Sequence, residues 1–152
     1  MVEGKPCGEC YMHVCDYIEA WGHANITAKN LKTFEITKEK YLTKRGDCII
    51  AVGSSKSARG LSDNFKIAAR SSTARIEIII ISGDQKASVI GWGDPNLTFE
   101  HETDLVARTS RYTCGRTVMI RADHAASEFS HEFVQALCNP NRKIKITLRV
   151  EV

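Results

Sequence analysis

A Gly/Ser-rich segment with two cationic side chains is the part of this sequence best suited to bind an anion. The segment Gly53 to Gly60 reads GSSKSARG and directly follows the apolar run Cys48 to Val52. A strand, a Gly/Ser loop and a helix start can gather backbone N–H groups around an anion. Lys56 and Arg59 add positive charge. We therefore predict a site for a phosphate-bearing ligand, in which Lys56 contributes to binding and, as a loop lysine, little to stability.

The predicted ligand-binding residues extend beyond this loop. They are Arg45, Ser54, Ser55, Lys56, Arg59 and Arg116. The spacing of the loop does not match a Walker loop, so the segment does not identify a nucleotide triphosphatase. Helix capping and solubility are the structural alternative for the same residues.

Four further side chains could act as acid or base groups. They are His23, Asp47, Asp123 and His124. If their loops converge where two halves of the chain join, they would form a small catalytic site. If they are dispersed over an open basic surface, a binding module for an anionic small molecule or RNA is favoured. We carry the binding module as the first hypothesis and the small enzyme as the alternative.

No sequence motif of a known catalytic or cofactor site supports a more definite assignment. The chain lacks a nucleophile elbow, an HExxH helix and a dinucleotide fingerprint. We therefore expect no cofactor and leave open whether the protein is an enzyme.

The first residues hold a cluster of potential metal ligands. Cys7, Cys10, His13 and Cys15 lie within nine residues of one another. Tetrahedral zinc sites usually take pairs of ligands from separate elements, so we expect no metal here and a flexible tail over residues 1–11. The start of the chain lacks the apolar core of a signal peptide, which predicts a cytoplasmic protein with reduced cysteines.

Charge and hydropathy exclude some partners. The formal net charge is +3, which is too small to indicate nucleic acid by itself. The segment Lys29 to Arg45 is basic, whereas Phe99 to Asp104 is acidic. No apolar run approaches the roughly 20 residues that span a bilayer, so we expect no membrane association.

An internal repeat organises the elements that must position these residues. Trp21 to Thr27 reads WGHANIT and Trp92 to Thr98 reads WGDPNLT, with both tryptophans of the chain at an offset of 71. Ala58, Ser62 and Phe65 match Ala126, Ser130 and Phe133 at an offset of 68. The chain is therefore interpreted as a duplication, which should be settled before any other assignment.

The hydrophobic pattern predicts strands and one helix in each half. We expect strands over His13 to Ala20, within Thr27 to Thr37, over Cys48 to Val52 and over Lys143 to Val152, the last closing the sheet. We expect helices over Asp63 to Arg70 and Phe133 to Cys138, with Ser62 and Ser130 as N-caps.

These elements predict a mainly β protein with a sandwich-like fold. Residues 12–152 should form a single duplicated domain, with a first half 12–82 and a second half 83–152, each with about four to five strands and one short helix. A closed cradle-loop barrel of the double-psi type is the alternative, because Gly46-Asp47 precedes a buried strand.

Several motifs resemble an archaeal family described only as a domain of unknown function. They are the Gly22-His23-x-Asn25 motif, the run Thr43 to Ile50 containing Arg-Gly-Asp-Cys-Ile-Ile, the His101-x-Thr103-Asp104 motif, and Arg116 with Ala122-Asp123-x-Ala125-Ala126. The resemblance covers roughly residues 12–150. It implies an archaeal, cytoplasmic, mainly β protein and implies no activity. His124 stands where the family favours lysine, and the cysteine-bearing start lies outside the resemblance.

Overall fold

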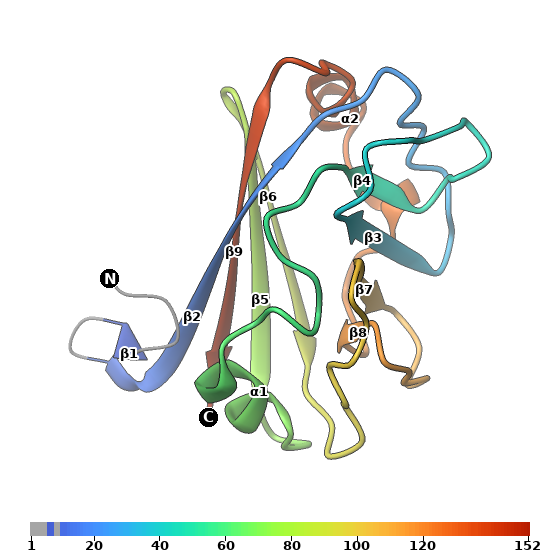
Figure 1. Cartoon of the computed structure of the whole chain (residues 1–152). Helices are drawn as coiled ribbons and strands as arrows, with labels where there is room; N and C mark the ends of the chain where they lie inside the picture. The colour runs from blue at the N-terminus through green and yellow to red at the C-terminus, as the bar shows by residue number, and fades with distance from the viewer. Residues whose placement is uncertain (1–5, 8–9) are drawn as a thin grey trace.

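Two β-sheets form the two layers of the protein. The computed structural model describes residues 6–7 and 10–152 (Figure 1). One sheet has the order β1 (Pro6–Cys7), β2 (Cys10–Trp21), β9 (Lys143–Glu151), β5 (Arg75–Ser82) and β6 (Gln85–Trp92). The other has the order β4 (Ile49–Ala51), β3 (Thr33–Thr37), β7 (Asp104–Arg108) and β8 (Thr117–Met119). The predicted mainly β, sandwich-like fold is confirmed.

The sheets are open layers, so the alternative of a closed cradle-loop barrel is wrong for the described residues. All neighbours in the five-stranded sheet are antiparallel. In the four-stranded sheet the central pair β3–β7 is antiparallel, whereas the outer pairs β3–β4 and β7–β8 are parallel. Figure 1 shows α1 (Asp63–Ala69) and α2 (His131–Leu137) at opposite ends of the sandwich.

Side-chain alternation along the long strands builds the core between the layers. Ile76, Ile78 and Ile80 of β5 are at most 1% exposed, whereas the intervening residues are partly or fully accessible. Successive side chains of a strand point to opposite faces, so one face of β5 is committed to the core. Phe34 and Ile36 of β3 belong to the same hydrophobic cluster from the opposite sheet.

The order of elements in the first half recurs in the second. The elements β2, β3, β4, α1 and β5 correspond to β6, β7, β8, α2 and β9, apart from the short 3₁₀ helix η1 (Ala126–Glu128). Trp21 forms an isolated bridge with Val52, and Trp92 forms one with Ile120, so the two Trp-Gly turns lie in matching environments. Most strand pairing joins the halves, because β2 and β5 both pair with β9, and β3 pairs with β7.

Each Trp-Gly turn packs on the end of the helix from the other half. The N–H of His23 donates to the carbonyl of Leu137 at 3.0 Å, and the N–H of Asp94 donates to the carbonyl of Ala69 at 3.1 Å. These bonds satisfy carbonyl groups at the helix C-termini, which have no partner within the helix. A Cβ atom on Gly22 would come closer than 3.0 Å to two of the carbonyl oxygens at the end of α2, so this position requires glycine.

The expected helices form with their expected N-caps. The Ser62 hydroxyl accepts from the N–H of Phe65, and the Ser130 hydroxyl accepts from the N–H of Phe133, each at 3.1 Å. No helix of the described residues is long and apolar enough to cross a bilayer.

At the ends of the chain one expectation needs correction, and the expected flexible tail stays a prediction. The strand expected to close the sheet, β9, lies in its centre between β2 and β5. Within the tail expected over residues 1–11, Pro6–Cys7 forms β1 and Cys10 begins β2, and the two strands pair with Cys7 opposite Cys10. The rest of the expected tail lies outside the described residues.

Candidate functional site

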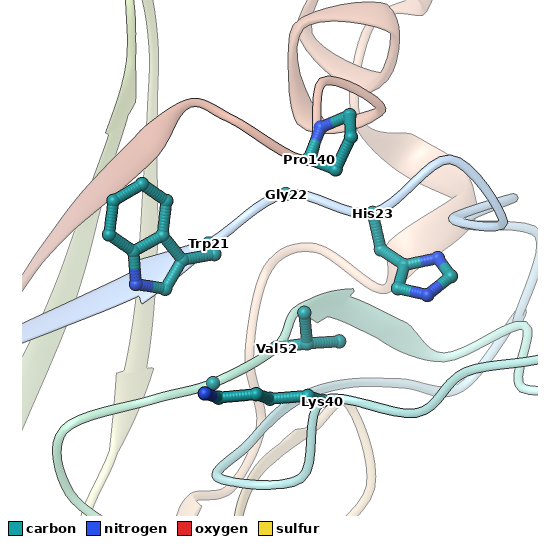
Figure 2. Close-up of a pocket in the computed structure, with 7 residues that line it drawn as sticks. Trp21, Gly22, His23, Lys40, Val52 and Pro140 are labelled. Atoms are coloured by element: carbon teal, nitrogen blue, oxygen red, sulfur yellow. The ribbon is translucent and has the colours of Figure 1, made fainter.

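A pocket beside the first Trp-Gly turn is the candidate site that we consider first. It has a volume of about 290 Å³ and is lined by Trp21, Gly22, His23, Lys40, Val52, Gly53 and Pro140. Figure 2 shows Trp21 and His23 at its two ends and Val52 between them. The residues come from four separate stretches of chain, and we call the site that they line the Trp21 pocket.

Backbone pairing fixes the walls of the Trp21 pocket. The N–H of Trp21 donates to the carbonyl of Val52 at 2.7 Å, and the N–H of Val52 donates back at 2.8 Å. The N–H of Gly53 donates to the carbonyl of Glu39 at 3.0 Å, which holds the segment before Lys40 against the same edge. The pocket therefore rests on paired backbone and needs no ligand to form.

The imidazole of His23 presents a hydrogen-bond donor. Its Nδ1 accepts from the N–H of Asn25 at 2.9 Å, and the Asn25 side chain donates to the carbonyl of Leu42 at 2.9 Å. An accepting Nδ1 carries no proton, so the neutral ring carries its proton on Nε2. His23 can therefore donate through Nε2 to a polar group of a ligand.

The charge of the Trp21 pocket is positive. Among the described residues, none of those lining the pocket is acidic, and Lys40 supplies an ammonium group. Figure 2 shows the Lys40 side chain along one wall, with its nitrogen at the Trp21 end. An exposed lysine attracts anions mainly through its charge, so the pocket favours a ligand with a negative group.

A corresponding pocket occurs in the second half. It has a volume of about 220 Å³ and is lined by Ser72, Gly93, Asp94, Arg111, Ile120 and Arg121. The offsets of 71 and 68 relate Gly93, Asp94 and Arg111 to Gly22, His23 and Lys40, and relate Ile120 and Arg121 to Val52 and Gly53. We call it the Trp92-side pocket.

The Trp92-side pocket differs from the Trp21 pocket at two equivalent positions, where it has a charged side chain of each sign. Arg121 stands at the position of Gly53, and its guanidinium lies 5.3 Å from the centre of the Trp92 ring. Asp94 stands at the position of His23 and brings a negative charge to the same pocket. Both Gly53 and Arg121 have positive φ, at 60° and 50°, so the backbone is alike and only the side chain differs. The first half thus leaves open a space that the second half fills.

The loop predicted to hold an anion directs its N–H groups into the protein. Seven backbone N–H groups of the loop donate to acceptors of the protein. They belong to Gly53, Ser54, Ser55, Lys56, Ala58, Arg59 and Gly60. Ser55 pairs with the edge of β2, donating its N–H to the carbonyl of Glu19 at 2.7 Å, while its hydroxyl accepts from the Glu19 N–H. These N–H groups therefore bind acceptors of the protein itself, and at Ser55 the loop pairs with the edge of β2.

The cations of that loop face carboxylates of the protein. Lys56 Nζ lies 3.2 Å from Asp16 Oδ1, and Asp16 is fully buried. Arg59 forms an exposed ion pair with Glu102 at 2.6 Å. Two other residues of the predicted set differ in their accessibility. Ser54 is buried and its hydroxyl donates to the carbonyl of Lys56, whereas Arg45 is exposed. Ligand binding by these residues stays a prediction.

The structure does not join the four acid/base candidates. His23 lines the Trp21 pocket, and Asp47 accepts from the side chain of Asn30 at 3.1 Å. Asp123 and His124 are paired at 2.8 Å, and Asp123 also accepts from the N–H of Ile90. Among the described residues, no hydrogen bond or ion pair links His23 or Asp47 with the Asp123–His124 pair.

Arg116 lies in a second polar cluster, on β3 and β7. Its Nη1 is 3.3 Å from Glu35 Oε1 and 3.4 Å from Asp104 Oδ2, and Thr37 donates to Asp104 at 2.7 Å. Burial, and then the charge of Asp104, raise the pKa of Glu35 from 4.5 to about 7, although Arg116 acts in the opposite direction. Burial and the neighbouring Asp104 carboxylate together outweigh the shared arginine, which is why the pKa of Glu35 lies near neutrality.

The three free thiols of the described chain have different environments. Burial acts to raise the pKa of Cys114, but hydrogen bonds from the Arg116 backbone, the Thr117 hydroxyl and the Arg108 guanidinium outweigh it and lower the pKa to about 7. Burial, aided by Glu35, raises the pKa of Cys48 to about 11. Burial also raises the pKa of Cys138.

The cluster of potential metal ligands at the start of the chain is only partly described. The side chains of Cys7 and Cys10 lie outside the described residues. His13 lies 3.3 Å from Glu151, and Cys15 is buried and disulfide-bonded, so the expectation of reduced cysteines is wrong for Cys15. Within the described residues, no group of three potential ligands could hold a metal ion.

The comparison with known families covers nearly the whole two-layer domain. The profile of the family described as "Domain of unknown function (DUF371)" matches residues 18–151. The chain belongs to the DUF371 family. This confirms the family expected from the motifs. The DUF371 chain is also similar to "Uncharacterized protein MJ0206" of the archaeon Methanocaldococcus jannaschii, with 42% identity over 120 residues, which are 79% of this chain and 88% of that protein.

Sequence reasoning missed the Trp21 pocket of this DUF371 chain, although His23 was among the candidates. Lys40 was noted only as part of the basic segment Lys29 to Arg45, and the tryptophans only as markers of the repeat. The informative signal was a difference within the repeat. A glycine at position 53, where the second half has arginine, marks a side chain missing from one of two similar pockets.

Proposed function

We propose that this DUF371 protein is a binding module for a small phosphate-bearing ligand, which it holds in the Trp21 pocket. The observation that carries the proposal is the unbalanced positive charge of a preformed pocket. Lys40 and His23 line a space with no acidic lining residue among those described. We expect the protein to act in the cytoplasm.

The size and shape of the pocket support a small molecule as ligand. About 290 Å³ is at the lower end of the volumes that hold small ligands in proteins. A single compact phosphate ester fits such a volume, whereas an RNA strand would need an extended basic surface. Of the basic loop Lys38 to Arg45, only Lys40 lines the pocket among the described residues.

The proposal is tested with ribose 5-phosphate as the probe. We expect saturable binding by calorimetry at low salt, with weaker binding at higher salt because the attraction is electrostatic. Lys40→Ala should weaken binding roughly tenfold, as expected for loss of a charged hydrogen bond of about 1.5 kcal/mol. The melting temperature should stay within about 1 °C, because Lys40 is exposed.

The second half supplies a matched control. Arg111 is the residue at the position of Lys40, and Arg111→Ala should leave the affinity unchanged. Equal losses in the Lys40 and Arg111 variants would point to unspecific attraction, and absence of binding by the wild type would remove the proposal. A short single-stranded RNA that binds tightly while ribose 5-phosphate does not would favour the RNA hypothesis instead.

A further inference from the structure

One side of the Trp21 ring is left open by the sequence of its own half. Trp21 is 39% exposed, and Lys143 Nζ lies 5.9 Å from the centre of its ring. A Cβ atom on Gly53 would lie 3.3 Å from Cδ1 of Trp21, so a side chain at this position would reach the ring. Because Gly53 has none, the indole borders directly on the Trp21 pocket (Figure 2).

The second half shows what kind of group this space accepts. There the planar guanidinium of Arg121 lies over the ring of Trp92, in a cation–π contact with a distance of 5.3 Å. The backbone at Gly53 has the same left-handed conformation as at Arg121. The space beside Trp21 is therefore shaped for a flat group that stacks on an indole.

Charge decides which flat group can occupy it. Lys143 lies over the Trp21 ring, and Lys40 places its ammonium at the Trp21 end of the pocket. The Glu19 carboxylate pairs with Lys143 at 3.2 Å, so part of that charge is compensated, whereas no carboxylate pairs with Lys40 in the described structure. These ammonium groups disfavour a freely diffusing cationic ligand, so a neutral aromatic ring is favoured as the ligand group, whereas an arginine tethered at position 53 could still occupy the space.

We propose that the ligand is nucleotide-like, with an aromatic base that stacks on Trp21 and a phosphate that is held by Lys40. This rests on the proposed function and adds the chemical class of the ligand. The His23 Nε2 donor stands at the opposite end of the pocket and can bind a sugar hydroxyl or a ring acceptor. Base–aromatic stacking tolerates every base, so the site should prefer nucleotides over sugar phosphates more than one base over another.

The test separates the base from the phosphate. Adenosine 5′-monophosphate, uridine 5′-monophosphate, ribose 5-phosphate and adenosine are titrated into the full chain by calorimetry. We expect both nucleotides to bind about tenfold or more tightly than ribose 5-phosphate. Trp21→Leu should abolish that preference while leaving the affinity for ribose 5-phosphate within about twofold, because Trp21 does not contact the phosphate in the proposed arrangement.

A second variant keeps the test independent of any folding effect of Trp21→Leu. Gly53→Arg introduces the residue that the chain already carries at the equivalent position, so the backbone conformation is compatible. It should fill the space beside Trp21 and weaken nucleotide binding at least tenfold. Quenching of Trp21 fluorescence by the nucleotide, measured in a Trp92→Phe background, should be lost in the same variant.

Each outcome has a distinct meaning. If ribose 5-phosphate binds as tightly as the nucleotides, the phosphate site stands and the stacking inference is overturned. If adenosine binds as tightly as the nucleotides, the ring is recognised and the phosphate role of Lys40 is overturned. If no probe binds, both proposals fail. Undiminished nucleotide affinity in Gly53→Arg would also contradict the inference, because the base would then bind at a place other than the space beside Trp21.

Discussion

Asp16 determines the role of the lysine in the Gly/Ser loop. Its carboxylate is fully buried, accepts from the N–H of Ser62 at 2.8 Å and pairs with Lys56, whose side chain is only 15% exposed. Removing one partner of a buried ion pair leaves an uncompensated charge, which is far more costly than loss of an exposed pair. The geometry gives Lys56 a structural role in this molecule, so we now expect it to contribute to stability, in contrast to the expectation from the sequence.

We predict that Lys56→Ala lowers the free energy of unfolding by about 3 kcal/mol, or roughly 10 °C in melting temperature. The exposed Lys44 provides the control, since Lys44→Ala should change the melting temperature by less than about 2 °C. Thermal denaturation followed by circular dichroism measures both. Adding Asp16→Asn to Lys56→Ala should recover part of the loss, and equal melting of wild type and Lys56→Ala would contradict the structural role.

The raised pKa of Glu35 makes stability depend on pH. The folded-state pKa of about 7 lies above the usual value of 4.5, so the folded state binds the proton more tightly than the unfolded state. The stabilisation that the protonated Glu35 gives to the folded state is complete below about pH 4.5 and is lost as the pH rises towards 7. A glutamine does not titrate, so between these pH values Glu35→Gln should gain up to about 3 kcal/mol in unfolding free energy relative to wild type.

Urea denaturation at several pH values measures this effect. Arg116→Gln provides an opposite control, because loss of the shared arginine should raise the pKa of Glu35 further and extend the pH dependence upward. A pH-independent difference between wild type and Glu35→Gln would show that Glu35 has the same pKa in the folded and unfolded states.

At the residue scale, sequence reasoning identified residue types better than their partners. Arg116 and Arg59 were chosen as ligand-binding cations, and both form ion pairs with acidic residues of the other half or of a distant strand. Such pairs link residues far apart in sequence, and no periodicity reveals them. The same holds for Lys56 and Asp16, which are 40 positions apart.

At the element scale, the two Trp-Gly turns act as reciprocal caps. Each turn donates to carbonyl groups at the C-terminus of the helix from the other half, and each glycine allows the backbones to approach closely. The motif that first revealed the repeat is therefore a junction between the halves. A glycine here serves close packing and not a special torsion, because neither Gly22 nor Gly93 has positive φ.

We predict that Gly22→Ala destabilises the protein by at least about 2 kcal/mol, because the added methyl group would clash with carbonyl oxygens of Leu137 and Asn139. Gly60→Ala is the control, since its Cβ would have no neighbour closer than 3.5 Å. That variant should stay within about 0.5 kcal/mol of wild type in urea denaturation. A harmless Gly22→Ala would mean that the turn can move away from α2.

Local patterns predicted the elements well and their neighbours less well. The helix starts at Ser62 and Ser130 and the strand character of Lys143–Glu151 follow from capping and alternation, which are local properties. The central place of β9 depends on pairing with β2 and β5, which local patterns do not encode. The start of β3 at Thr33 was also unclear, because the preceding residues have no strand alternation.

At the scale of the whole molecule, neither half contains the pairings that would make it stable alone. The long ladders β2–β9 and β5–β9 and the central pair β3–β7 all join one half to the other. Within a half, β4 and β8 each add only a short parallel pair to β3 and β7. Isolated strand pairs of this size are marginal in water, so the halves should depend on each other.

We predict that fragments covering residues 12–82 and 83–152 are each largely unfolded in isolation. Mixed in equal amounts, they should regain the β-sheet signal, because all the ladders between halves can then form. Circular dichroism of each fragment and of the mixture measures this. A fragment that melts cooperatively by itself would show that one half carries an independent core.

The register of β2 and β9 has a consequence for the connectivity of the fold. Val14 lies opposite Val150, just as Gln85 lies opposite Ser82, where the two-residue turn Gly83-Asp84 joins β5 to β6. The end of β9 and the start of β2 are therefore poised for an equivalent hairpin, and the described chain is topologically a ring with a single opening. A circular permutant that begins at Asp84 and connects Glu151 to His13 through a short turn would keep every ladder except that of β1.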